Sequence, residues 1–297
     1  MSLGGLVAVH AHPDDESLST GALLATWARA GLPTTVVTCT RGERGEVIGE
    51  ALAHLEGDGS ALAAHRTGEL ADALAALGVR DHVFLDEVPG VSEDRFEDSG
   101  MAWVGTGQAA LADEVPPHAF VGVHPQDAAE RLAHVLRERR PSVVVTYEPG
   151  GGYGHPDHVR AHEVTRRALE LVDPAPLLLM AVQGEHALRA GYAALADVVL
   201  DGPLRRPDAG GPLPSVAVPD DKVNLAVDVL PVRDRVLAAL RAHGTQVQAV
   251  RSVDDEVALV GCYALSNEVL APLLPVETYR VVGDLDGAWP PGVRRIT

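Results

Sequence analysis

The sequence predicts an α/β protein with a doubly wound, mostly parallel sheet that carries helices on both faces. Apolar or β-branched runs predict buried strands at residues 6–11, 33–40, 82–86, 142–147 and 177–182. Segments with helical spacing of apolar residues lie between these runs. Strands and helices that alternate in this way form βαβ units, whose strands pair in parallel.

The helices are predicted at residues 17–30, 61–77, 127–140, 157–172 and 232–243. Helix 61–77 has leucines on one side and is stopped by Gly78. Segment 87–122 is rich in Pro and Gly and is too long for a simple connection, which favours a functional loop. Residues 149–154, PGGGYG, form a glycine-rich turn in front of helix 157–172.

The 297 residues are expected to form a core over residues 1–183 and a smaller C-terminal α/β region, residues 184–297, packed on it. The periodic pattern loosens after residue 183, and the Pro- and Gly-rich stretch 202–221 is the candidate for a linker or excursion. A late strand is predicted at 277–282. A chain of this length buries roughly three quarters of its unfolded surface, so a metal site would serve chemistry rather than folding.

Composition excludes several classes of protein. The formal net charge of −18 repels phosphate backbones and anionic lipid, so we expect no nucleic-acid partner and no membrane partner. Cys39 and Cys262 have no Cys-x-x-Cys spacing and predict no disulfide framework. The first residues lack the pattern of a signal peptide, and apolar stretches fall short of the ~18 residues of a membrane span. We expect a cytoplasmic protein; its oligomeric state has no signal in the sequence.

Two histidine-rich motifs follow predicted strands, at the edge where open α/β sheets bind ligands. The motif HAHPDDE, residues 10–16, follows the first strand. A catalytic zinc takes three nitrogen or oxygen ligands and leaves one position for water. His12 and Asp15 can supply two ligands from one turn, while Asp14 can face the water and accept its proton.

The third ligand has two candidates, because the motif YGHPDH, residues 153–158, offers both His155 and His158. The alternative interpretation is that the acids of residues 14–16 only complement a helix N-terminus. That explains the carboxylates but not the histidines beside them, so a metal site is favoured. The chain has no Gly-x-Gly-x-x-Gly after the first strand and no P-loop, which argues against a nicotinamide-dependent oxidoreductase.

The motifs resemble those of the zinc-dependent deacetylases related to the N-acetylglucosaminyl-phosphatidylinositol deacetylase, the LmbE-like or PIG-L family. The family motif AHPDDE is present as residues 11–16 and HPDH as residues 155–158. Softer segments are similar to the branch of that family that acts on N-acetylglucosaminyl-inositol in mycothiol biosynthesis. These segments are GGYGHPDH at 151–158, DSGM at 98–101, His65-Arg66 and ALSN at 264–267.

The resemblance implies a Rossmann-like fold and hydrolysis of the N-acetyl group of N-acetylglucosaminyl-inositol to a free amine and acetate. It implies one zinc ion per chain, bound by His12, Asp15 and His158, although Fe²⁺ is possible because such a ligand set accepts both metals. It also implies Asp14 as the general base that activates the attacking water.

Further roles follow from the same resemblance. Tyr153 helps to hold the oxyanion, and His155 protonates the leaving amine while Asp157 orients it. The residues implied to contact the inositol-bearing sugar are Arg66, Asp98 and Met101.

Three other functions stay open at this point. A mycothiol S-conjugate amidase would cleave a related amide with a bulky thiol conjugate, and another N-acetylated amino sugar could be the substrate. A metal-binding protein without catalysis would need His12, Asp15 and His158 but not Asp14. The presence of all four favours turnover.

Overall fold

One large sheet dominates the computed structural model, which describes residues 4–90, 95–105, 108–112, 115–199, 202–255, 258–283 and 288–296. Five parallel strands lie in the order β3–β2–β1–β6–β7. Their bounds are β1 Leu6–His10, β2 Thr34–Thr38, β3 Asp81–Phe84, β6 Val143–Tyr147 and β7 Leu177–Gly184. The predicted fold class, a mixed α/β protein with a mostly parallel sheet, is confirmed.

Later parts of the chain extend this sheet beyond β7 in antiparallel fashion, in the order β13, β9, β14. These strands are β9 (Leu225–Asp228), β13 (Val276–Val282) and β14 (Val293–Arg295), and the two-residue β8 (Ala217–Val218) pairs in parallel with β7. The predicted division at residue 183 falls within β7, and both parts of the chain contribute to one sheet. The division into two regions therefore stays a prediction about organisation.

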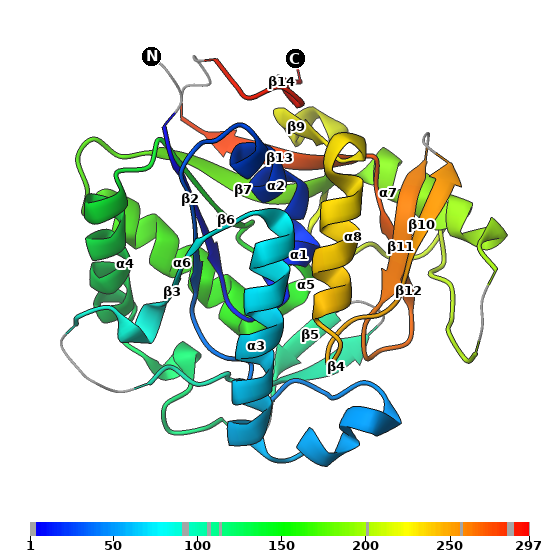
Figure 1. Ribbon diagram of the computed structural model, residues 1–297, viewed down its shortest axis with the longest axis horizontal. Helices are drawn as coiled ribbons and strands as arrows, with labels where there is room; N and C mark the ends of the chain where they lie inside the picture. The colour runs from blue at the N-terminus through cyan, green and yellow to red at the C-terminus, as the bar shows by residue number, and fades with distance from the viewer. Residues whose placement is uncertain are drawn as a thin grey trace.

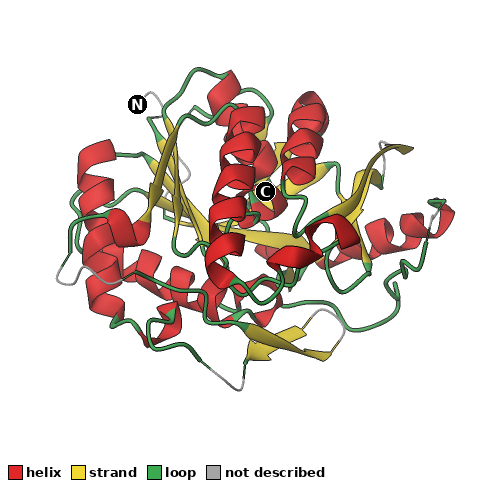
Figure 2. Cartoon of the chain, turned by 60° about the horizontal axis from the view of Figure 1, so that its bottom comes forward, coloured by secondary structure: helices red, strands yellow, loops and turns green. Residues whose placement is uncertain are grey.

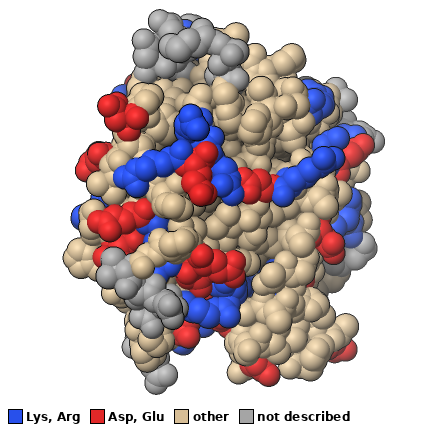
Figure 3. All heavy atoms as spheres, turned by 60° about the vertical axis from the view of Figure 1, so that its left-hand side comes forward, with Lys and Arg blue, Asp and Glu red and all other residues tan. Residues whose placement is uncertain are grey.

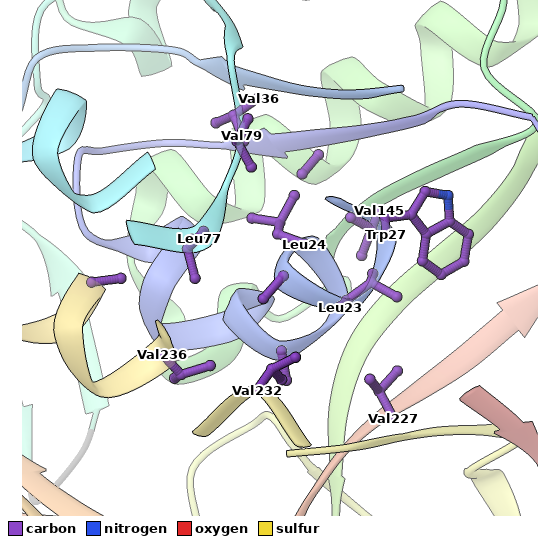
Figure 4. Close-up of a cluster of buried hydrophobic side chains, with 14 of the residues drawn as sticks. Leu23, Leu24, Trp27, Val36, Leu77, Val79, Val145, Val227, Val232 and Val236 are labelled. Atoms are coloured by element: carbon purple, nitrogen blue, oxygen red, sulfur yellow. The ribbon is translucent and has the colours of Figure 1, made fainter. Parts of the chain in front are cut away.

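Helices cover both faces of the sheet (Figure 1). One face carries α2 (Gly21–Arg29), α3 (Gly59–Leu77) and α8 (Arg233–Ala242); the other carries α4 (Pro125–Arg139) and α6 (Pro156–Glu170). Side chains of a strand alternate between faces, so Leu6 and Ala8 of β1 join one core and Val7 and Val9 the other. Figure 4 shows the first core, where Leu23, Leu24 and Trp27 of α2 pack beside strand valines.

Local signals explain where these helices begin and end. The Asp58 carboxylate accepts the Ala61 N–H at the start of α3, and Gly78 ends that helix in the left-handed conformation with φ 86°. Helix α6 starts with Pro156 at its first position, where no N–H is needed. The predicted helix 17–30 is divided at Thr20 into α1 (Asp15–Ser19) and α2.

Several elements were absent from the prediction. Segment 87–122, predicted as a loop, contains the hairpin β4 (Met101–Gly105) and β5 (Gln108–Leu111); residues 91–94, 106–107 and 113–114 of it lie outside the described residues. The C-terminal region adds α7 (Glu185–Ala194) and a three-stranded sheet, β10 (Gln248–Asp255), β11 (Leu259–Ala264) and β12 (Leu270–Leu273). Figure 2 shows both small sheets apart from the main one. Register shifts between β10 and β11 break the two-residue period that identifies a strand.

The surface over the α4 and α6 side of the molecule carries interspersed acidic and basic side chains (Figure 3). Ion pairs of this kind join Arg139 to Asp81 and Arg160 and Arg167 to Glu163. This face therefore has no large area of one charge. Among the described residues, no helix combines the length and the apolar character needed to cross a membrane.

Candidate active site

The two histidine motifs meet because β1 and β6 are neighbours in the sheet while their following helices lie on opposite faces. Such a reversal opens a crevice at the carboxyl ends of the strands. The chain after β1 enters α1, and the chain after β6 enters the short helix α5 (Gly151–Gly154), close to β5 (Figure 1). Both predicted motifs therefore line one crevice.

Three buried imidazoles form the centre of the crevice. The ring centroids of His12 and His155 are 4.5 Å apart, those of His12 and His158 5.3 Å, and those of His155 and His158 4.9 Å. One donor atom from each of the three lies within 4.8 Å of the others, and the same holds for His12, Asp98 and Asp157. Among the described residues these two groups are compact enough for a metal ion, and neither of them is the predicted set His12, Asp15 and His158.

The tautomers of His12 and His158 follow from their partners. Nε2 of His12 lies 3.2 Å from a carboxylate oxygen of Asp157, and Nδ1 of His158 lies 3.1 Å from the carbonyl oxygen of Gly151. Both partners accept hydrogen bonds, so each of these ring nitrogens carries the proton. In the neutral rings, Nδ1 of His12 and Nε2 of His158 then carry the lone pairs, and each of these atoms faces an oxygen of Asp15 at 3.3 Å.

Acceptors that face each other in a buried site are stabilised by a positive charge between them, either a proton or a metal ion. Nε2 of His158 is buried and makes no hydrogen bond among the described residues. Burial opposes charge on His12, but Asp98, Asp15 and Asp157 outweigh it and raise the pKa of His12 well above its ordinary value. A tetrahedral zinc site with bonds near 2.1 Å places donor atoms about 3.4 Å apart, close to the 3.3 Å that separates one Asp15 oxygen from Nδ1 of His12 and the other Asp15 oxygen from Nε2 of His158.

Asp157 has a different partner from the one expected. Its carboxylate contacts His12 and accepts hydrogen bonds from the backbone N–H and the hydroxyl of Ser99, at 2.9 and 2.5 Å. The expected carboxylate contact with His155 is not seen, because Nδ1 of His155 accepts the backbone N–H of Asp157 at the start of α6. The sequence analysis includes Ser99 only as part of the segment DSGM, residues 98–101, and assigns it no role.

His155 therefore differs chemically from its two neighbours. Since Nδ1 accepts a hydrogen bond, the proton of the neutral ring is on Nε2. Burial, followed by the neighbouring His12 and His158, holds the pKa of His155 well below its ordinary value. His155 offers a neutral N–H donor rather than a lone pair for a metal.

Asp14 occupies a strained position between these groups and α3. Its φ of 125° is disfavoured for any residue with a Cβ atom. Nη2 of Arg66 lies 3.2 Å from its carboxylate and also donates to the carbonyl oxygen of Pro13. Burial raises the pKa of Asp14 to about 7, while Arg66 opposes this shift. Backbone strain of this kind is concentrated at functional sites.

Tyr153 belongs to the glycine-rich turn after β6. Its ring centroid is 5.0 Å from that of His158, and burial raises its pKa well above 10. Glu148 fixes the turn, because its carboxylate accepts the N–H groups of Gly150 and Gly152. The turn therefore directs the Tyr153 ring toward the histidines.

Tyr147, the last residue of β6, was also missed by the sequence analysis. Its ring stacks on His158 with centroids 4.2 Å apart, and its hydroxyl accepts the N–H of Ala11. Its place at the end of a predicted strand beside a motif was the signal available in the sequence.

The predicted sugar contacts occupy three different settings. Arg66 is buried, and its guanidinium donates to Pro13, Asp14 and Gly42. Asp98 is buried 3.7 Å from Nε2 of His12 and accepts the N–H of Gly100. Met101 begins β4 and pairs with Leu111, and no described contact joins it to the histidine cluster.

Two cavities border the cluster. One, of about 240 Å³, is lined by Asp15, Tyr153 and His158 and otherwise mainly by apolar residues, among them Tyr192, Tyr263, Leu265 and Leu274. The other, of about 1000 Å³, is polar and is lined by Asp98, Arg41, Arg44, Glu43 and Arg95 among others. The apolar cavity thus reaches Asp15, Tyr153 and His158, whereas the polar cavity reaches only Asp98 among the predicted site residues.

Solved structures support the fold. The deacetylase–teicoplanin complex from teicoplanin biosynthesis has a TM-score of 0.53 at 20% identity and covers 95% of this chain and 100% of that chain. GalB, the 4-carboxy-2-hydroxymuconate hydratase from Pseudomonas putida KT2440, has a TM-score of 0.54 at 18% identity, over 96% and 99% of the two chains. A hydratase and a deacetylase share this fold, so the fold alone does not specify the chemistry.

Sequence relatives are much closer. The 1D-myo-inositol 2-acetamido-2-deoxy-alpha-D-glucopyranoside deacetylase of Kineococcus radiotolerans is 47% identical over 292 residues, which cover 94% of this chain and 77% of that protein. A protein of the same description from Saccharopolyspora erythraea is 43% identical over 95% of this chain and 91% of its own length. Residues 7–169 match the family described as PIG-L, GlcNAc-PI de-N-acetylase. On this evidence the chain belongs to the PIG-L family of deacetylases, hydrolases that act on amides.

Proposed function

We propose that the protein removes the acetyl group from 1D-myo-inositol 2-acetamido-2-deoxy-α-D-glucopyranoside, in mycothiol biosynthesis, and releases acetate and the free amine. Support comes from relatives at 40–47% identity that carry the name of this activity. The observation that carries the proposal is the pair of imidazole lone pairs facing Asp15 beside a strained Asp14. A cation site next to a held carboxylate suits amide hydrolysis.

We propose His12, Asp15 and His158 as the ligands of one zinc ion per chain, with Fe²⁺ as the alternative metal. The tautomers support this choice, because these two histidines direct lone pairs at Asp15 while His155 directs an N–H. When bound, the metal supplies the Lewis acidity that amide hydrolysis needs at neutral pH.

The remaining roles belong to the side chains of this chain. Asp14 accepts a proton from the attacking water, and its backbone strain and the contact with Arg66 keep the carboxylate in place. The Tyr153 hydroxyl stabilises the oxyanion that forms on the acetamide oxygen. His155 is neutral, so its Nε2–H donates a hydrogen bond to the leaving nitrogen, and the proton that Asp14 accepted from the water passes to that nitrogen when the C–N bond breaks.

The sugar is assigned to the polar cavity beside Asp98, because its hydroxyl groups need hydrogen-bonding partners. Asp98 and Met101, two of the proposed sugar contacts, lie three residues apart in the chain. The third, Arg66, donates a hydrogen bond to the carbonyl oxygen of Pro13, next to Asp14. A cytoplasmic site of action and the absence of nucleic-acid and membrane partners remain predictions from the sequence.

The first experiment measures amine release from N-acetylglucosaminyl-inositol by zinc-loaded protein and by a chelated sample. We expect release that depends on the metal and returns when zinc or iron(II) is added back. A folded, metal-replete sample that releases no amine would rule out this substrate while leaving the family intact.

A second candidate activity is supported by the apolar cavity of about 240 Å³ that opens on Asp15, Tyr153 and His158. This space favours an amide with a larger acyl group than acetyl, as in a mycothiol S-conjugate amidase. The same assay with a thiol-conjugate amide compares the two, and the higher kcat/KM decides between them.

A further inference from the structure

The backbone of Asp14 is connected by hydrogen bonds to a residue that is distant in the sequence. Its backbone N–H donates to Oε2 of Glu16 at 3.0 Å, and the other carboxylate oxygen, Oε1, lies 2.7 Å from Nε2 of His243. Glu16 and His243 are both completely buried. A chain of contacts thus runs from the end of α8 to the backbone of Asp14.

We propose that His243 is a positioning residue for Asp14, which it holds through the carboxylate of Glu16. This inference rests on the proposed role of Asp14 as the base. It adds a residue from the C-terminal region, about 230 positions away in the sequence, to the machinery of the N-terminal motif.

The strain at Asp14 gives this contact its importance. A non-glycine residue at φ 125° is strained and persists only when its surroundings fix it. Glu16 fixes the Asp14 N–H, but a carboxylate can rotate about its own bond. His243 and the hydroxyl of Ser17 both bind Oε1 and so leave Oε2 directed at Asp14.

The imidazole of His243 makes few other polar contacts with the described residues. Its Nδ1 is buried and makes no hydrogen bond among the described residues, and its second Nε2 contact, with Ser17, is longer, at 3.4 Å. The turn that carries it is anchored independently, because Thr245 donates twice to Glu69 and its carbonyl oxygen accepts the N–H of Ile48. The side chain can therefore be changed while the turn stays in place.

The test compares His243→Gln with His243→Asn. The amide nitrogen of Gln lies where Nε2 of histidine lies and reaches Glu16, whereas that of Asn lies near Nδ1 and does not. We expect Gln to keep kcat within about threefold and Asn to lower it about tenfold or more, with KM and bound zinc unchanged, because small displacements of a base are costly. Thr245→Val, which removes a buried hydrogen bond from the same turn, is the control for a loss of stability alone.

Two further measurements separate positioning from structure. In an Asp14→Ala background, His243→Asn should cost almost nothing more, since both changes act through one group. Amide exchange at Asp14 should be faster in His243→Asn than in His243→Gln, and this readout holds even if the wild-type protein fails to deacetylate the proposed substrate. Equal kcat and equal exchange in the Gln and Asn variants, or an additive cost in the Asp14→Ala background, would overturn the inference.

Discussion

The two loops that form the site differ in the residues that they place at positive φ angles. The loop after β1 places a non-glycine residue, Asp14, at φ 125°. The loop after β6 puts glycine at each of its positive-φ positions, Gly151, Gly152 and Gly154. Glycine adopts such angles without a steric cost. In these two loops, strain is retained at the one position, Asp14, whose side chain is proposed to act in the reaction.

The largest effect is expected from Asp14→Ala, which tests the first loop. Removal of a general base typically costs 10²- to 10⁴-fold, so kcat should fall by about that factor while bound metal stays stoichiometric. Steady-state kinetics and metal analysis of the same sample check this. A variant with wild-type kcat would show that Asp14 is not the base.

Asp14→Gly sharpens the same comparison. It should lose the same activity as Asp14→Ala yet be more stable by about 1 kcal/mol, because glycine relieves the strain at this φ. Urea denaturation of the two variants measures the difference. Equal stability would mean that the observed φ stores no strain.

The second loop should show its largest effect through metal binding. His158→Ala removes a proposed ligand and should weaken zinc affinity at least about tenfold to a hundredfold, with activity lost in parallel. His162→Ala, one turn later on α6, is the matched control, since among the described residues that side chain hydrogen-bonds to the Tyr147 carbonyl oxygen and to no proposed ligand. Stoichiometric, tightly bound zinc in His158→Ala would remove His158 from the ligand set.

Two glycines of the second loop test the role of glycine directly. A Cβ at Gly154 would lie 2.9 Å from the carbonyl oxygen of Ala109, whereas one at Gly152 meets nothing within 4 Å. Gly152→Ala should therefore cost only backbone strain, about 1 kcal/mol, and Gly154→Ala about 1–2 kcal/mol more. The midpoints of urea denaturation rank the stability of the two variants. Equal losses of stability would mean that the β4–β5 hairpin, which contains Ala109, moves to accommodate the added methyl group.

The sequence predicted what depends on local pattern. Strand and helix periodicity identified the parallel core, and two short motifs placed His12, Asp14 and Asp15 beside His155 and His158 at two strand ends. The choice of His158 over His155 as a ligand came from the family resemblance and stays a proposal. Contacts between distant segments could not be predicted in this way. The pairing of Asp157 with His12 and Ser99, and that of Glu16 with His243, depend on tertiary packing that leaves no periodic signal. The irregular sheet β10–β12 was missed for the same reason.

The smallest expected effect concerns α2, whose first turn is hydrogen-bonded by a residue that is distant in the sequence. The Glu277 carboxylate of β13 accepts the N–H groups of Ala22 and Leu23 at the start of α2, and burial raises its pKa from 4.5 to about 7. A raised pKa in the folded state means that the stabilisation is complete below the unfolded pKa of 4.5 and is lost as the pH rises through about 7. Relative to Glu277→Gln, the wild-type protein should thus lose about 1 kcal/mol of unfolding free energy between pH 6 and pH 7. Urea titrations at the two pH values measure this loss. Glu185→Gln, which removes an exposed charge from α7, is the control and should show no such trend. If the difference in unfolding free energy between wild type and Glu277→Gln did not change with pH, Glu277 would be ionised throughout this range.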